Sequence, residues 1–161
     1  MKQIELTQGK VAIVDDEDFE RLNQFKWFAA RYRHYWYAKR SIRVKGKVVA
    51  IHMHREIMNA PEGMSVDHRN GDGLFNCKEN LRLCTHQQNM HNRQHPSKNN
   101  QLGVKGVYWN KREKKFKTQI RINRKLLHLG YFNVLAEADS AYRKAEEKYF
   151  GEFSRKECVL Q

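Results

Sequence analysis

An aspartate and a histidine stand side by side at Asp67-His68, and a glycine-rich turn follows them. A carboxylate beside an imidazole could place a metal ligand next to a general base. A divalent ion and a base that lie this close suit the hydrolysis of a phosphodiester bond. Downstream polar side chains that could complete such a site are Asn76, Asn80, His86, Asn89 and Asn92.

Charge and composition favour nucleic acid as the source of that phosphodiester. The 161 residues carry a formal net charge of +13, which attracts a polyanionic partner. The three cysteines have no Cys-x-x-Cys spacing, so neither a disulfide framework nor a zinc knuckle is predicted. No apolar run approaches the length of a membrane span. We therefore expect a soluble, cytoplasmic protein that binds no membrane and needs no small-molecule cofactor.

The elements around Asp67-His68 are predicted to be strand, loop, strand and helix. A short strand over 64–66 leads into the pair, and Asn70-Gly71-Asp72-Gly73 is a strong turn signal. A second strand follows over 81–83, and Thr85 can cap a helix that runs to about residue 93. Neighbours on an extended strand point to opposite faces, so both side chains serve one site only if the strand ends there. The turn allows this.

These residues resemble the HNH endonuclease motif, most closely that of phage and intron homing endonucleases. The resemblance implies a ββα-metal fold in which His68 is the general base, Asp67 and Asn89 bind the metal, and Asn80 orients the histidine. The spacing from His68 to Asn80, and that from His68 to Asn89, are ordinary for that branch. Many members have histidine at the position of Asn89. The all-oxygen ligand set here makes Mg²⁺ or Mn²⁺ the expected cofactor.

Four other polar residues near the motif have alternative interpretations. Asn76 could shape the loop or contact DNA, and His86 could bind the metal or a phosphate, or be a solvated helix residue. His52 and His54, on a predicted helix over 52–58, are expected to pack or to bond the backbone.

The region over 1–51 is predicted to be β-rich, with short strands, a helix over 19–25 after an acidic patch, and a hairpin over 43–51. The aromatic residues between 27 and 37 are expected to form core. This region resembles the leader found before phage HNH motifs, and the sequence assigns it no activity of its own.

A basic C-terminal region follows a polar linker at 94–102. Nine lysines and arginines and one acid lie between positions 103 and 125. Three strands near 106–109, 115–122 and 126–132 are predicted, with a helix over 135–150 that Asn133 can cap. Lys117, Gln119 and Arg121 then share one strand face. Arginine suits guanine and glutamine suits adenine in the major groove of DNA, and the A-form groove of RNA is too narrow for such a face.

This region resembles the Apetala/ethylene-response-factor DNA-binding domain through Gly106-Val107-Tyr108-Trp109, Leu129-Gly130-Tyr131-Phe132 and Ala141-Tyr142. The resemblance implies a three-stranded antiparallel sheet that lies in the major groove, backed by one helix. The candidate DNA contacts are Tyr108, Asn110, Arg112, Lys117, Gln119, Arg121 and Arg124.

The sequence therefore predicts a modular α+β protein: a β-rich region over 1–51, an HNH unit over 52–93, a linker over 94–102, a DNA-binding domain over 103–155 and a tail over 156–161. The expected function is metal-dependent cleavage of double-stranded DNA by a monomer or homodimer. A phage homing endonuclease is the favoured type, working in the host bacterial cytoplasm. The rival is a DNA-binding regulator or phage packaging accessory protein whose HNH unit is structural or inactive.

Overall fold

A computed structural model describes residues 1–92, 96 and 99–154 of a mixed α+β protein. Two compact units are present, one formed mainly by Met1–Asn89 and a second over Met90–Glu157. In the described ranges no helix is long and apolar enough to cross a membrane. The predicted tail at 156–161 and most of the predicted linker (93–95 and 97–98) lie outside the described residues.

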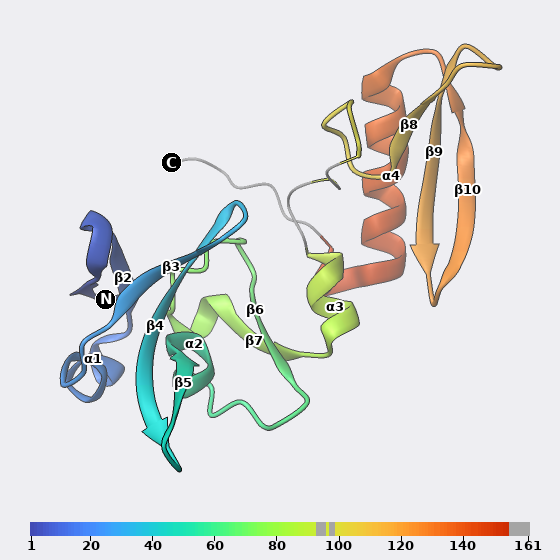
Figure 1. The fold of residues 1–161 in the computed structure, drawn as a ribbon. Helices are drawn as coiled ribbons and strands as arrows, with labels where there is room; N and C mark the ends of the chain where they lie inside the picture. Colours follow the sequence, from blue (N-terminus) through green and yellow to red (C-terminus); the bar gives the residue numbers. More distant parts are fainter. Residues whose placement is uncertain (93–95, 97–98, 155–161) are drawn as a thin grey trace. The chain divides into compact units, whose positions relative to one another are not determined.

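The first unit contains three small antiparallel sheets, β1-β2, β3-β4-β5 and β6-β7, with three short helices (Figure 1). Its elements are β1 (Lys2–Glu5), β2 (Val11–Val14), α1 (Asp16–Asn23), β3 (Phe28–Tyr32), β4 (Tyr35–Val44), β5 (Lys47–His52), α2 (Met53–Ile57), β6 (Ser65–His68), β7 (Leu81–Cys84) and α3 (His86–His91), whose last two residues fall in the second unit. The acidic residues Asp16, Glu17 and Asp18 form the first turn of α1, so this helix begins at Asp16 and not at the predicted position 19.

One hydrophobic core joins the N-terminal segment to the central one. It includes Val14 from β2, Leu22 from α1, Ala38 from β4, and Val66 and Leu81 from β6 and β7. A ββα hairpin alone buries too little apolar surface to be stable, since chains below about 40 residues usually need additional support. The region over 1–51 supplies that support, and it forms one compact unit with the segment that carries Asp67-His68.

The second unit is a three-stranded antiparallel sheet with one helix packed on it (Figure 1). Its elements are β8 (Val107–Asn110), β9 (Lys115–Ile122), β10 (Lys125–Phe132) and α4 (Leu135–Phe150). Ile120 of β9 is buried with Tyr142, Ala145 and Phe150 of α4. Gly106 has φ +73°, and a Cβ there would lie 1.9 Å from the Tyr142 ring, so this glycine permits the close approach of helix and sheet.

The predicted cap of α4 differs from the structure. The helix begins at Leu135, and its N-cap is the extended Val134, which makes no side-chain cap bond. Asn133 lies one position too early to serve as the cap.

Candidate active site

Asp67 and His68 are the last two residues of β6, and β7 pairs with them in antiparallel register. Asp67 lies opposite Arg82, and His68 lies opposite Leu81. Residues that face each other across a ladder share a sheet face, and neighbours alternate. Asp67 and His68 therefore leave β6 on opposite faces of the hairpin, and His68 is the last residue of the strand.

Asn76 holds the imidazole of His68. The two side chains are joined by a hydrogen bond of 3.2 Å between His68 Nε2 and Asn76 Oδ1. The amide Nδ2 of Asn76 donates to Leu74 O at 3.1 Å, which leaves Oδ1 to face the histidine. An amide oxygen only accepts, so Nε2 carries the proton and Nδ1 is the basic nitrogen of the neutral ring.

Asn80, which the resemblance assigns to orient His68, bonds instead to the loop between the two strands. Its Oδ1 accepts from Asn70 N at 3.0 Å, and its Nδ2 donates to Phe75 O at 2.7 Å. Its own carbonyl accepts from Arg69 N at 2.8 Å. Asn80 thus ties the two ends of the loop together. Its influence on His68 is indirect, because its hydrogen bonds fix the loop.

The N-terminal strand β2 fixes the same loop from outside. Ile13 N donates to Leu74 O at 2.9 Å, and Asn76 N donates to Ile13 O at 2.7 Å. Lys78 N donates to Asp15 Oδ2 at 2.7 Å just beyond. The loop segment that carries Asn76 therefore pairs with β2 in the manner of an additional strand.

A wall of aromatic and histidine rings covers the other side of His68. The His54 ring meets it edge-on with centroids 5.0 Å apart, and the Tyr37 ring lies 6.1 Å away. His52 lies 5.0 Å from His54. The glycine turn is tightly packed here, because a Cβ on Gly73 would lie 2.3 Å from a main-chain oxygen of β4.

Burial in this wall keeps the histidines neutral. It lowers the pKa of His54 to about 2 and that of His52 to about 4. Burial also lowers the pKa of His68, although the hydrogen bond with Asn76 and the charge of Asp67 act to raise it. A neutral His68 at physiological pH can accept a proton.

The carboxylate of Asp67 forms a buried ion pair with Arg82. Arg82 Nε and Nη2 both donate to Asp67 Oδ2, at 2.8 and 2.5 Å, and both side chains are almost fully buried. Charges removed from water need such a partner, since an isolated buried carboxylate is strongly unfavourable. Arg82 therefore supplies the partner that a carboxylate in the interior needs.

The helix α3 begins with reciprocal capping bonds. Thr85 Oγ1 accepts from Gln88 N at 3.2 Å, and Gln88 Oε1 accepts from Thr85 N at 2.8 Å. This start directs Asn89 toward β7, where its backbone N–H reaches the sulfur of Cys84. The charge of Asp67 also acts on Cys84, whose pKa burial raises to about 11. The backbone of Asn89 therefore lies near Cys84, the last residue of β7.

The donor chemistry at Asp67 and Asn89 suits a hard divalent cation. Both offer oxygen atoms, and the half-buried Asn89 amide has no side-chain hydrogen-bond partner within the described residues. His86 is exposed at the first position of α3. No group of three or more His, Cys, Asp or Glu side chains in the described part of the chain is arranged as a metal site, so a cation here would rely on Asp67, Asn89 and water.

A comparison with known families matches the segment that contains Asp67 and His68. A family profile described as HNH endonuclease matches residues 59–91, which contain β6, the loop, β7 and α3. This segment is an HNH endonuclease domain. No curated protein and no solved structure matches the chain.

The second unit shows a polar sheet face away from α4. Thr118 and Ile120 of β9 are buried beneath the helix, whereas Lys117, Gln119 and Arg121 alternate with them on the opposite face. The register places an aromatic residue of each neighbouring strand beside Lys117, namely Tyr108 and Tyr131.

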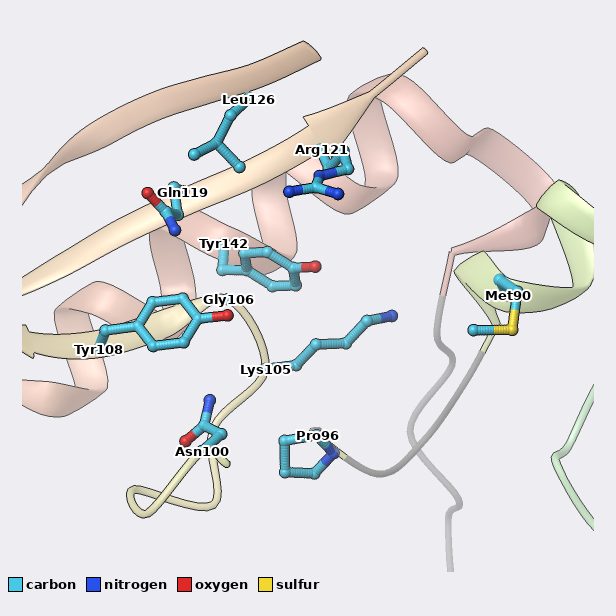
Figure 2. Close-up of a pocket in the computed structure, with 10 residues that line it drawn as sticks. All are labelled: Met90, Pro96, Asn100, Lys105, Gly106, Tyr108, Gln119, Arg121, Leu126 and Tyr142. Atoms are coloured by element: carbon cyan, nitrogen blue, oxygen red, sulfur yellow. The ribbon is translucent and has the colours of Figure 1, made fainter. Parts of the chain in front are cut away.

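A hollow of about 280 Å³ lies at one edge of this face (Figure 2). Tyr108, Gln119 and Arg121 line it together with Leu126 and Tyr142. The side chains of Tyr108, Gln119 and Arg121 make no hydrogen bonds within the described residues. They are therefore available to an external ligand.

The other predicted contacts in this unit lie at the end of β8 or in turns. Asn110 Oδ1 accepts from the backbone N–H groups of Arg112 and Glu113 at 3.0 and 3.2 Å, so its side chain shapes the turn after β8. The Arg112 side chain is 93% exposed. Arg124 lies exposed in the β9–β10 turn with φ 66°.

Sequence reasoning did not identify the wall or the ion pair. Tyr37, His52 and His54 come close to His68 only through the register of β3, β4 and β5, which no local pattern indicates. Arg82 carried a usable signal, because an arginine in a short strand that pairs with Asp67 must share its face.

Proposed function

We propose that this protein is a metal-dependent endonuclease that hydrolyses phosphodiester bonds in double-stranded DNA. The observation that carries the proposal is the neutral His68, held through Nε2 by Asn76 inside a matched HNH endonuclease domain. The basic character of the chain supports DNA as the substrate.

In this proposal His68 Nδ1 removes a proton from the attacking water. Asn76 keeps the ring in the tautomer whose Nδ1 is unprotonated, and the low pKa of His68 keeps it neutral. Asn80 and β2 hold the loop that carries Asn76. These contacts fix the base before DNA arrives.

Asp67 and Asn89 would hold Mg²⁺ or Mn²⁺, which would stabilise the negative charge that develops on the phosphoryl oxygens and on the leaving 3′ oxygen. Arg82 orients the Asp67 carboxylate by its two hydrogen bonds.

The second unit would recognise DNA in the same proposal. Lys117, Gln119 and Arg121 present donors from one strand face, and Tyr108 and Tyr131 flank them. The dimensions of a sheet suit the major groove of B-form DNA. A phage homing endonuclease is the type that the motif and this sheet together favour.

The test is incubation of supercoiled plasmid with the protein in Mg²⁺ or Mn²⁺, with an EDTA control. Nicked or linear DNA should form only with the metal. The burial of Asp67 and His68, and the pairing of Asp67 with Arg82, favour a second candidate, a DNA-binding protein whose HNH domain is structural. DNA binding without cleavage on any substrate would identify that candidate.

A further inference from the structure

The hairpin formed by β4 and β5 is an exposed, basic ribbon. Every residue over 43–50 is exposed. From Arg21 to Arg55, both included, the chain holds ten lysines and arginines and no acidic residue. This segment is therefore strongly basic, like the second unit, and the HNH match at 59–91 does not include it.

The two faces of the ribbon differ because its residues alternate. The face that also carries Tyr37, which we call the open face, consists of three cross-strand pairs: Lys39 with His52, Ser41 with Ala50, and Arg43 with Val48. The serine and alanine between the two basic residues keep the open face flat.

The open face leads directly to His68. The rings of Tyr37 and His52 lie at one end of it and contact His54, whose ring meets that of His68. Lys39 is close enough that its charge acts on both His52 and His54. The open face is thus a continuation of the active-site wall toward solvent.

The charges on the open face have no acidic partner among the described residues. Neither Lys39 nor Arg43 forms an ion pair with any described residue. Arg40, on the opposite face, is bound to Glu56 at 2.9 Å and stacks on the Phe25 ring. The charge of Arg40, which packs inward, is therefore balanced by Glu56. The charges of Lys39 and Arg43 on the open face can instead bind an external anion.

We propose that the open face holds the sugar-phosphate backbone of the DNA strand where it leaves the active site, with Lys39 and Arg43 on two phosphates of that strand. The inference rests on the proposed nuclease function for its substrate. The distance from Lys39 to Arg43 along an extended strand is about 13 Å, so the two cations can contact two separate phosphates of one strand.

The test compares full-length variants in DNA binding with EDTA and in cleavage with Mg²⁺. Lys39→Gln with Arg43→Gln removes two charges from the open face. The matched control is Lys47→Gln, an exposed change on the opposite face of the same ribbon. Two lost phosphate contacts should reduce the slope of log K against log salt by about 1.8, so that the affinity advantage of the wild type shrinks about tenfold between 50 and 200 mM salt.

Cleavage by the double variant should show a raised KM with kcat within about threefold of the wild type, and Lys47→Gln should match the wild type in both assays. An unchanged salt slope in the double variant would overturn the inference, as would an equal effect of Lys47→Gln or tighter binding to duplex RNA of the same sequence. A wild type that does not cut DNA, together with a double variant that binds DNA more weakly, would refute the nuclease function. It would still support DNA binding by the open face.

Discussion

His54 provides a quantitative test of the buried ring wall. Burial lowers its pKa to about 2, while in the unfolded chain it titrates near the ordinary value of 6.5. Below pH 6.5 only the unfolded state takes up this proton, so stability is full above 6.5 and falls as the pH is lowered toward the folded pKa. One pH unit corresponds to about 1.4 kcal/mol, so the 1.5 units down to pH 5.0 cost about 2 kcal/mol. This cost of about 2 kcal/mol hardly depends on the pKa of His54 in the folded protein, provided that this pKa lies below about 4.

The assay is urea denaturation at pH 7.5 and pH 5.0 of the wild type and His54→Gln. Glutamine is uncharged and of similar length. The substitution changes the packing at both pH values, and only the difference between them reports the proton. The wild type should lose about 2 kcal/mol more than the variant between the two conditions. Equal losses in the two proteins would refute the burial of a neutral His54 against His68.

Three further substitutions test the supports of the site. Asn76→Ala leaves the His68 Nε2–H without its buried acceptor. The variant should lose about 1–3 kcal/mol of stability in urea melts. In single-turnover cleavage its kcat should fall, and its DNA affinity should not change. Arg82→Met should cost about 3–5 kcal/mol because it leaves a buried carboxylate, and adding Asp67→Asn should recover much of that loss; no recovery would contradict the pair. Gly73→Ala should lower the melting temperature, since its Cβ would overlap the main chain of β4, and an unchanged melting temperature would show that the turn is loosely packed.

The second unit was the more predictable part of the fold. The strand over 115–122 and the helix over 135–150 have the bounds that the sequence suggested. Their signals are local, since alternation defines β9, a small-residue stripe defines α4, and both residues of the Asn123-Arg124 turn adopt positive φ.

The first unit depends on contacts that are distant in sequence. The motif located Asp67 and His68, but the choice between Asn76 and Asn80 as the partner of His68 is made by the path of the loop. That path is set by Ile13 of β2, which lies far from the loop in the sequence. Spacing alone could not show it. The role of the region over 1–51, which completes the core and holds the loop, became visible only in the fold.

The proposed function depends on His68 as the general base of the nuclease. The most direct measurement is the single-turnover rate of plasmid cleavage in Mg²⁺ by the wild type and His68→Ala, with His86→Ala as an exposed histidine control. We expect His68→Ala to lose about 10²–10⁴-fold in rate while it binds DNA as tightly as the wild type, and His86→Ala to retain activity. Cleavage by His68→Ala within about tenfold of the wild-type rate would contradict it.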